Sequence, residues 1–167
     1  MADQVTRVRV PIIAVALAAL GCGVHEVARA PRHLDMAAKA FTTQPGQARV
    51  YVYRMGSILD FNYFAIGVTV VDRDRHLGYL GRKDYLATDL SPGHYYLSAT
   101  VRNEKTSVVY PDGAGVQLDV AADRVYFVRV ETRRLAPVYP PTVRPMDEVQ
   151  GRQEIDECRL INFFPTR

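Results

Sequence analysis

The stretch SPGHYYLSATV, residues 91–101, decides the predicted fold. It begins with Ser91-Pro92-Gly93, a strong turn signal, because proline and glycine supply the backbone angles that tight turns require. From His94 onward polar and apolar side chains alternate, which is typical of a β-strand with one buried face. We expect the buried face to carry Tyr95, Leu97, Ala99 and Val101.

The same two-residue period recurs elsewhere in the chain. ARVYVYR, residues 48–54, sets two valines against Tyr51 and Tyr53, and VYFV, residues 125–128, is apolar on both faces, as in a central strand. Shorter segments of this kind lie near residues 66–70, 77–80, 85–87 and 116–120. Many short strands separated by turn signals predict a mainly β fold, a single antiparallel β-sandwich.

A short N-terminal helix and a short C-terminal helix are expected beside the sandwich. Apolar side chains recur at helical spacing over residues 33–41, so we expect Leu34 and Phe41 to dock this helix on the domain. Asp35 and Lys39 are spaced to form an i,i+4 ion pair on its other side.

The C-terminal helix is expected over residues 146–157, weakened by Gly151. Four prolines precede it. They predict that the segment before the helix is irregular or an edge strand, because proline has no N–H group to donate to a neighbouring strand. They are Pro137, Pro140, Pro141 and Pro145. The apolar residues 158–164 are compatible with a last strand.

The first 22 residues have the layout of a secretory signal. Arg7 and Arg9 precede an uncharged apolar run of eleven residues, Val10–Leu20, and a small residue precedes Cys22. The run is too short for a transmembrane helix, which needs ~20 apolar residues. The cysteine makes the segment resemble a bacterial lipoprotein signal, in which the cysteine is acylated and becomes the first mature residue. We therefore expect residues 1–21 to be removed and Cys22 to be lipidated.

Plain secretion is the alternative, because lipoprotein signals usually have leucine three residues before the cysteine, where this chain has Ala19. Two or three acyl chains would make the attachment practically permanent, since each buried methylene contributes ~0.8 kcal/mol. Gly23 follows the cysteine instead of aspartate, which under the enterobacterial sorting pattern favours the outer membrane, facing the periplasm. Residues 22–32 are expected to form a tether, and residues 33–167 the β-sandwich domain.

The order of the strand and turn segments resembles that of a known family. The segments are ARVYVYR at 48–54, LGYL at 77–80, LSPGHY at 90–95 and VYF at 125–127. This order is similar to a family of bacterial lipoproteins with a β-sandwich domain of unknown function, and the Pro-Gly-His turn resembles PEGA-like surface domains. The resemblance covers about residues 33–162. It implies a location and a fold, and it carries over no catalytic residue.

Charge and cysteine content narrow the choice of partners. Without residues 1–21 the formal net charge is +2, and the basic residues are scattered among acids, so no nucleic-acid partner is expected.

If Cys22 is acylated, Cys158 has no other cysteine with which to form a disulfide within the chain. We expect Cys158 to be buried, as free cysteines usually are. A reactive Cys158 thiol, or a disulfide with an unacylated Cys22, are the alternatives.

Tyrosines are the most suggestive binding candidates on the strands. Tyrosine offers apolar contact area together with a hydroxyl, which suits contacts with proteins or sugars. The alternative is that these tyrosines pack under the helices or across strands. The candidate binding residues are Tyr51, Tyr53, Tyr79, Tyr85 and, just after the turn, His94.

Motifs for catalysis or metal binding are missing from the sequence. It has no H-x-x-x-H, H-E-x-x-H or G-x-S-x-G pattern, and Asp72-Arg73-Asp74 lacks the further ligands of a calcium loop. We therefore expect no cofactor and no metal, and a non-enzymatic lipoprotein that binds a protein or another envelope component. The alternative is an envelope hydrolase or metal-dependent enzyme that uses His94 with Ser91 and nearby acids.

Overall fold

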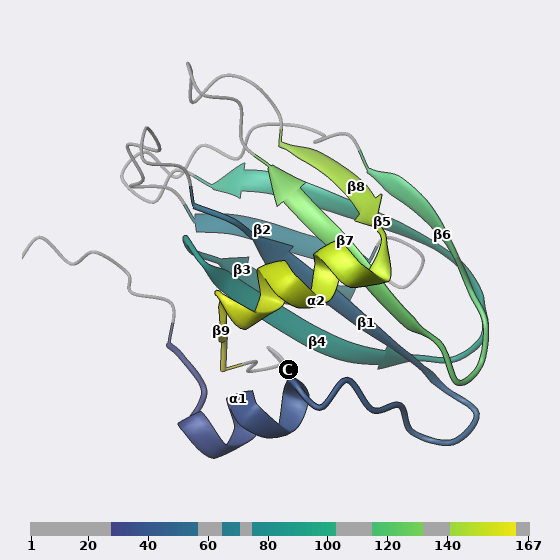
Figure 1. Cartoon of the computed structure of the whole chain (residues 1–167). Helices are drawn as coiled ribbons and strands as arrows, with labels where there is room; N and C mark the ends of the chain where they lie inside the picture. The colour runs from purple at the N-terminus through teal and green to yellow at the C-terminus, as the bar shows by residue number, and fades with distance from the viewer. Residues whose placement is uncertain (1–27, 57–64, 71–74, 103–114, 132–140, 163–167) are drawn as a thin grey trace, which may run out of the picture.

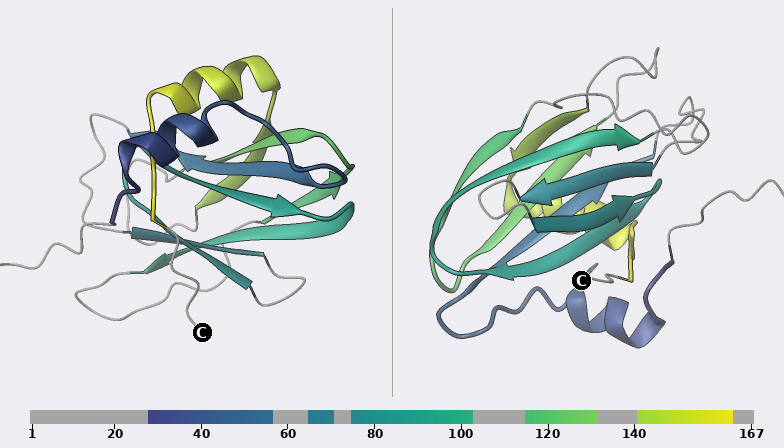
Figure 2. Two further views of the ribbon diagram at one scale, coloured as in Figure 1. Left: turned by 90° about the horizontal axis from the view of Figure 1, so that it is seen from below. Right: turned by 180° about the vertical axis from the view of Figure 1, so that it is seen from behind.

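Two β-sheets stack face to face, and two helices cover the outer face of one of them (Figure 1; Figure 2, left). The computed structural model describes residues 28–56, 65–70, 75–102, 115–131 and 141–162. The mainly β fold with two short helices is thus confirmed. The signal segment and Cys22 lie outside the described residues, and so do residues 163 and 164 of the expected last strand. Among the described residues, no helix has the length and apolar character needed to span a bilayer.

The helices and strands follow the predicted segments closely, with shifts of a few residues at their ends. In chain order they are α1 (Arg32–Ala38), β1 (Ala48–Arg54), β2 (Ala65–Val70), β3 (Arg75–Leu80), β4 (Asp84–Leu90), β5 (Gly93–Arg102), β6 (Val116–Val120), β7 (Val125–Glu131), β8 (Thr142–Met146), α2 (Glu148–Asp156) and β9 (Arg159–Leu160).

The strand pairing corrects one prediction. The five-stranded sheet has the order β8-β7-β1-β4-β9, and the four-stranded sheet has the order β3-β2-β5-β6. β1 pairs with β7 in parallel, and β4 pairs with β9 in parallel, so the larger sheet is mixed and not antiparallel throughout. Alternation of side chains has the same period in both kinds of ladder, so the sequence pattern could not reveal the strand direction.

The interior between the sheets is built by alternating side chains, as predicted. Tyr95, Leu97 and Ala99 of β5 are buried there, while His94 and Tyr96 point outward. Val50 and Val52 of β1 enter the same cluster from the other sheet. β7 is hydrogen-bonded on both sides, to β1 and β8, which agrees with its apolar faces. Pro145 lies on β8, an edge strand, as expected for a residue without a donor.

A second core lies between the five-stranded sheet and the helices. It contains the other face of β1, the facing side chains of its two neighbours, and one side of α2. Its buried members are Ala38, Tyr51, Tyr53, Tyr85, Phe127, Ile155 and Cys158.

α1 docks through a different face from the one predicted. Leu34 is 45% exposed, whereas Asp35 and Ala38 are buried. The Asp35 carboxylate accepts a hydrogen bond of 2.8 Å from the Leu160 amide, so its burial satisfies a backbone group. The Asp35–Lys39 ion pair forms, at 3.3 Å, on the buried side and not on the solvent side. Phe41 packs as expected, but it follows the helix, with φ of 53°.

The packed part of the chain starts earlier than His33. The Ala30 amide donates to the Leu160 carbonyl at 2.8 Å, and Arg29 forms an antiparallel bridge with Ile161. Residues 28–31, assigned above to the tether, therefore lie against β9 as part of the domain. The sequence could not predict this pairing, because the two residues of β9 are too few to show an alternation of polar and apolar side chains.

Gly151 explains why α2 can lie close to the sheet. A Cβ atom on Gly151 would lie 2.3 Å from Cγ of Phe127, so only glycine allows this approach. The expected weakening of the helix is thus the cost of a close contact with β7. Asp147 begins the helix by accepting a 2.9 Å hydrogen bond from the Gln150 amide.

We predict that Gly151→Ala destabilises the protein, although the same change in an exposed helix stabilises by ~1 kcal/mol. Overpacking against Phe127 should lower the free energy of unfolding by about 1–3 kcal/mol, measured by urea denaturation. Gln153→Ala, at an exposed position of the same helix, is the control and should change stability by less than about 0.5 kcal/mol. A Gly151→Ala protein as stable as the parent would contradict the close contact.

Candidate functional site

Three of the predicted binding tyrosines are core residues. Tyr51, Tyr53 and Tyr85 are fully buried beneath the helices, so they offer no surface to a partner. The alternative interpretation, packing under the helices, holds for them. Tyr51 stacks on Phe127 with ring centroids 5.4 Å apart, and Phe41 closes the cluster.

The hydroxyls of these three tyrosines each donate a hydrogen bond to a group of a helix. Tyr51 donates to the Ala38 carbonyl, Tyr85 to the Asp35 carbonyl at 3.2 Å, and Tyr53 to the Glu154 carboxylate at 2.6 Å. Burial is the main cause that raises the pKa of all three phenols. These hydroxyls therefore serve to fasten the helices to the sheet.

Glu154 is held by a network on the sheet side of α2. Its carboxylate also accepts hydrogen bonds from Arg129 at 2.7 Å and from Gln150 at 2.9 Å. Arg129 further pairs with Glu131. Every charge in this network has an opposite partner, which is the pattern of a structural ion-pair cluster and not of a poised acid.

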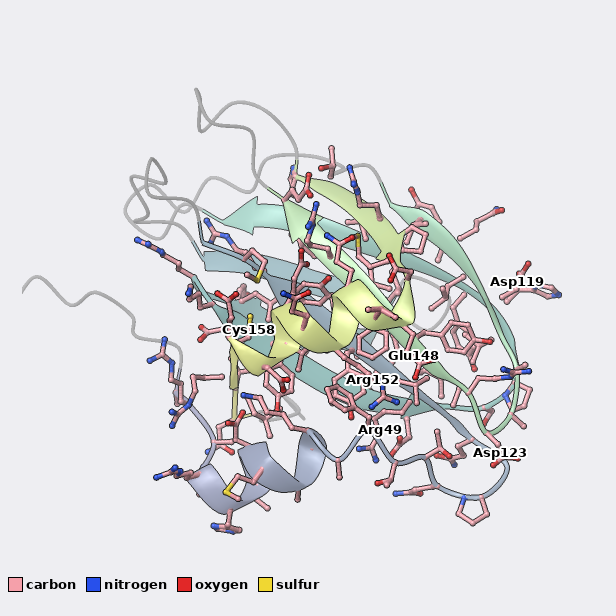
Figure 3. The ribbon with its side chains drawn as sticks, in the orientation of Figure 1. Arg49, Asp119, Asp123, Glu148, Arg152 and Cys158 are labelled. Carbon is pink, nitrogen blue, oxygen red and sulfur yellow. The ribbon has the colours of Figure 1, made fainter. Side chains whose placement is uncertain are left out.

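Tyr79 and His94 lie in the other sheet from the tyrosine cluster, on two strands that are not neighbours. Tyr79 is on β3, with its ring 4.6 Å from the ring of His76. His94 is the second residue of β5, and its Nδ1 lies 2.6 Å from the Asp119 carboxylate; both side chains are more than four-fifths exposed. Figure 3 shows Asp119 at the periphery, away from Cys158. The structure thus does not bring the five predicted residues into one site.

The described lining of the hollow beside His94 contains no serine, threonine or cysteine. This shallow hollow, about 190 Å³, is lined by Gly93, His94, Asp119, Val120 and Ala121. In the part of the chain that the structure describes, no three side chains of the His, Cys, Asp and Glu types come together to hold a metal.

Cys158 is buried, as predicted. Its Sγ lies 3.7 Å from the sulfur of Met55, and burial raises the pKa of the thiol to about 12. A thiol that stays protonated is a poor nucleophile. Cys158 is therefore a packing residue of the second core.

Sequence reasoning missed a basic corner, defined by five residues that surround the point where the described chain begins. The β3–β4 turn, β9 and the start of α1 meet here, because the Arg159 amide donates to the Lys83 carbonyl and Arg29 bridges to Ile161. Three carboxylates pair with the corner: Asp84, Asp35 and Glu157. The basic residues are Arg29, Arg32, Arg82, Lys83 and Arg159, all partly or fully exposed.

Two buried carboxylates beneath this corner have pKa values that are shifted in opposite directions. Burial raises the pKa of Asp84, and the nearby charge of Arg29 and the hydrogen bond from the Gly81 amide offset this only in part. Burial also acts to raise the pKa of Asp35, but the hydrogen bond from the Leu160 amide, the nearby Tyr85 hydroxyl and the charge of Lys39 outweigh it and lower the pKa.

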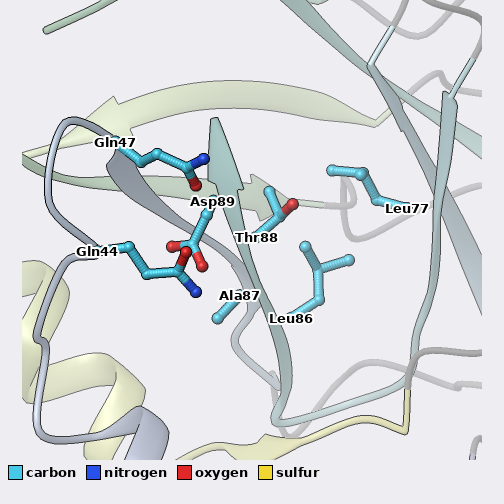
Figure 4. A pocket seen from close by; sticks show the side chains of 7 residues that line it. All are labelled: Gln44, Gln47, Leu77, Leu86, Ala87, Thr88 and Asp89. Carbon is cyan, nitrogen blue, oxygen red and sulfur yellow. The ribbon is translucent and has the colours of Figure 1, made fainter. Parts of the chain in front are cut away.

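A hollow of about 380 Å³, the β4 hollow, opens at the free side of β4 (Figure 4). Leu86 and Thr88 line it from the inner face of the strand, and Ala87 and Asp89 from the outer face. Leu77 of β3 contributes an apolar wall. Two exposed or half-exposed amides from the loop before β1, Gln44 and Gln47, form the rim.

Comparison with known proteins found no family model, no curated protein and no solved structure that matches this chain.

We predict opposite pH effects for Asp35→Asn and Asp84→Asn. The stability that ionised Asp35 contributes is present above its unfolded pKa, ~3.9, and is lost as pH falls through its lowered folded pKa. For Asp84 the raised folded pKa makes ionisation costly, so stability is lost as pH rises from ~3.9 through the folded pKa.

Urea denaturation of the two variants from acid to neutral pH measures this difference. The Asp35→Asn variant should be about 1–3 kcal/mol less stable than the parent at neutral pH and should approach it in acid. The free energy of unfolding of the Asp84→Asn variant should increase relative to that of the parent as pH rises. Parallel curves for the parent and both variants would contradict the assignment.

Proposed function

We propose that this protein is a lipid-anchored envelope lipoprotein that acts by binding a protein or another envelope component, without catalysis. The proposal rests on the signal layout ending in Cys22 and on the way the domain begins. The localisation we propose is the outer membrane, facing the periplasm.

The observation that carries the proposal is the position of the basic corner. The described part of the domain begins at Ala28, six residues after Cys22, and five basic side chains lie around this point. Six residues span at most ~20 Å, so an acylated Cys22 would hold this corner near the lipid surface. Three carboxylates pair with the five cations, so the corner keeps a net charge of +2. Basic side chains near anionic headgroups contribute ~1 kcal/mol each, so this remaining charge favours such a surface.

Binding is preferred to catalysis because of the chemistry of the described side chains. His94 and Asp119 form an exposed pair, and the described lining of their hollow has no serine, threonine or cysteine. The buried Tyr53 and Asp35 are tied into the helix contacts. The β4 hollow offers a mixed polar and apolar lining beside a strand, which suits contact with another molecule.

We predict that Cys22→Ser releases the protein from the membrane and leaves its precursor unprocessed. The acyl chains supply the attachment, because marginal headgroup contacts cannot replace buried methylenes. Fractionation of cells and mass spectrometry of the mature N-terminus measure the two effects.

Cys158→Ser is the matched control, since these are the two cysteines of the chain. It alters a buried packing residue, so it should reduce stability but leave processing and membrane attachment intact. Normal maturation and membrane fractionation of the Cys22→Ser protein would overturn the proposal.

A further inference from the structure

The outward face of α1 is apolar, although this helix lies at the outside of the molecule (Figure 1). Leu34 and Met36 are 45% and 64% exposed, and Ala37, which lies between them around the helix, is exposed as well. The one acidic residue of α1, Asp35, is buried and accepts a hydrogen bond from β9. The helix is thus reversed relative to an ordinary surface helix, which turns its apolar side to the core.

α2 has the ordinary arrangement, although it covers the same sheet. It buries Gly151 and Ile155 and turns a mainly polar side outward. The exposed residues of α2 are Glu148, Val149, Gln150, Gln153 and Asp156. The sheet therefore does not impose an apolar outer face on the helices that cover it, and the face of α1 has a separate cause.

The apolar face of α1 adjoins the basic corner. Arg32 is the first residue of α1 and is exposed, and Arg29 precedes it by three residues. Arg159 lies 3.9 Å from the Asp35 carboxylate, so its guanidinium lies beside the same helix. Because the corner keeps a positive net charge, excess cations border the apolar side chains. This composition is typical of helices that lie in the headgroup region of an anionic leaflet.

The chain between Cys22 and α1 is short. Six residues lead from Cys22 to Ala28 and four more lead to Arg32, so the whole segment reaches at most ~33 Å when fully extended. An acylated Cys22 therefore keeps α1 within reach of the leaflet. The tether makes a second contact with lipid intramolecular, so a contact that is too weak to bind the free protein is sufficient.

We propose that α1 lies on the lipid surface, with Leu34, Met36 and Ala37 among the headgroups of the leaflet that holds the acyl chains. The basic corner then contacts anionic headgroups. The four-stranded sheet, on the far side of the sandwich from the helices, faces away from the lipid (Figure 2, left). This inference rests on the proposed lipid anchor and names the membrane-facing surface of the anchored domain.

Fluorescence quenching in vesicles tests the proposal. Met36→Cys protein is expressed with its signal, purified from membranes, labelled with an environment-sensitive fluorophore and reconstituted. The vesicles contain phosphatidylethanolamine and phosphatidylglycerol, with or without a lipid that carries a nitroxide near the headgroup end of its acyl chain. We expect the nitroxide lipid to remove about half or more of the fluorescence, because an interfacial helix is buried by ~5–10 Å.

Gln117→Cys is the matched control. Gln117 is exposed on β6, in the four-stranded sheet, so its label should lose little fluorescence. The parent protein, treated with the same label, reports any reaction at the buried Cys158. Flotation of the vesicles measures attachment separately from quenching.

A charge on the apolar face supplies a second arm, with the label on Ala37→Cys. Met36→Glu should reduce the quenching of this label at least about twofold, because a carboxylate opposes insertion among anionic headgroups. Gln117→Glu adds the same charge on the far sheet and should leave the quenching unchanged. Both positions are exposed, so both variants should fold, which circular dichroism checks.

The contrary outcomes are distinct. Protein that floats with the vesicles while its Met36 label is not quenched would mean that α1 faces water, a partner protein or another part of the chain. Equal quenching of the Met36 and Gln117 labels would mean that the domain has no fixed orientation. Either result overturns this inference and leaves the anchor intact. Protein that does not float with the vesicles overturns the lipid anchor as well.

Discussion

The structure depends on one constraint: the outer face of the five-stranded sheet carries tyrosines whose hydroxyls must be hydrogen-bonded once they are buried. A buried hydroxyl without a partner costs about 1–3 kcal/mol. Tyr51 and Tyr85 find their partners on α1, and Tyr53 finds its partner on α2. The helices are thus positioned by specific polar contacts, and the aromatic rings between them supply the apolar area.

The same constraint connects the core to the surface that we place near lipid. Asp35 holds the Leu160 amide, and Lys39 donates to the Cys158 carbonyl at 2.8 Å, so α1 fastens the chain between α2 and β9. This contact brings Arg159 next to the residues that lead toward Cys22.

The sequence was sufficient for the strands and for the burial of Cys158, because a period of two and an apolar environment are local properties. It was insufficient where distant segments meet. The two valines of β1 show that one face of the strand is apolar. The alternation alone does not decide whether Tyr51 and Tyr53, on the other face, form a binding surface or pack under the helices. Only the burial of Asp35, a polar residue, reveals which side of α1 faces the sheet. No local pattern predicts that a charge will be buried to satisfy a backbone amide.

Tyrosine ionisation tests the central claim most directly. Carbon-13 NMR of the Cζ atoms of Tyr53 and Tyr85 reports whether each phenol loses its proton as pH is raised. Because burial raises both pKa values, the account predicts that both phenols stay protonated past pH ~10, where unfolded tyrosine ionises, until the protein itself unfolds. Ionisation of either phenol near pH ~10 in the folded protein would contradict the claim that the helices seal this face of the sheet.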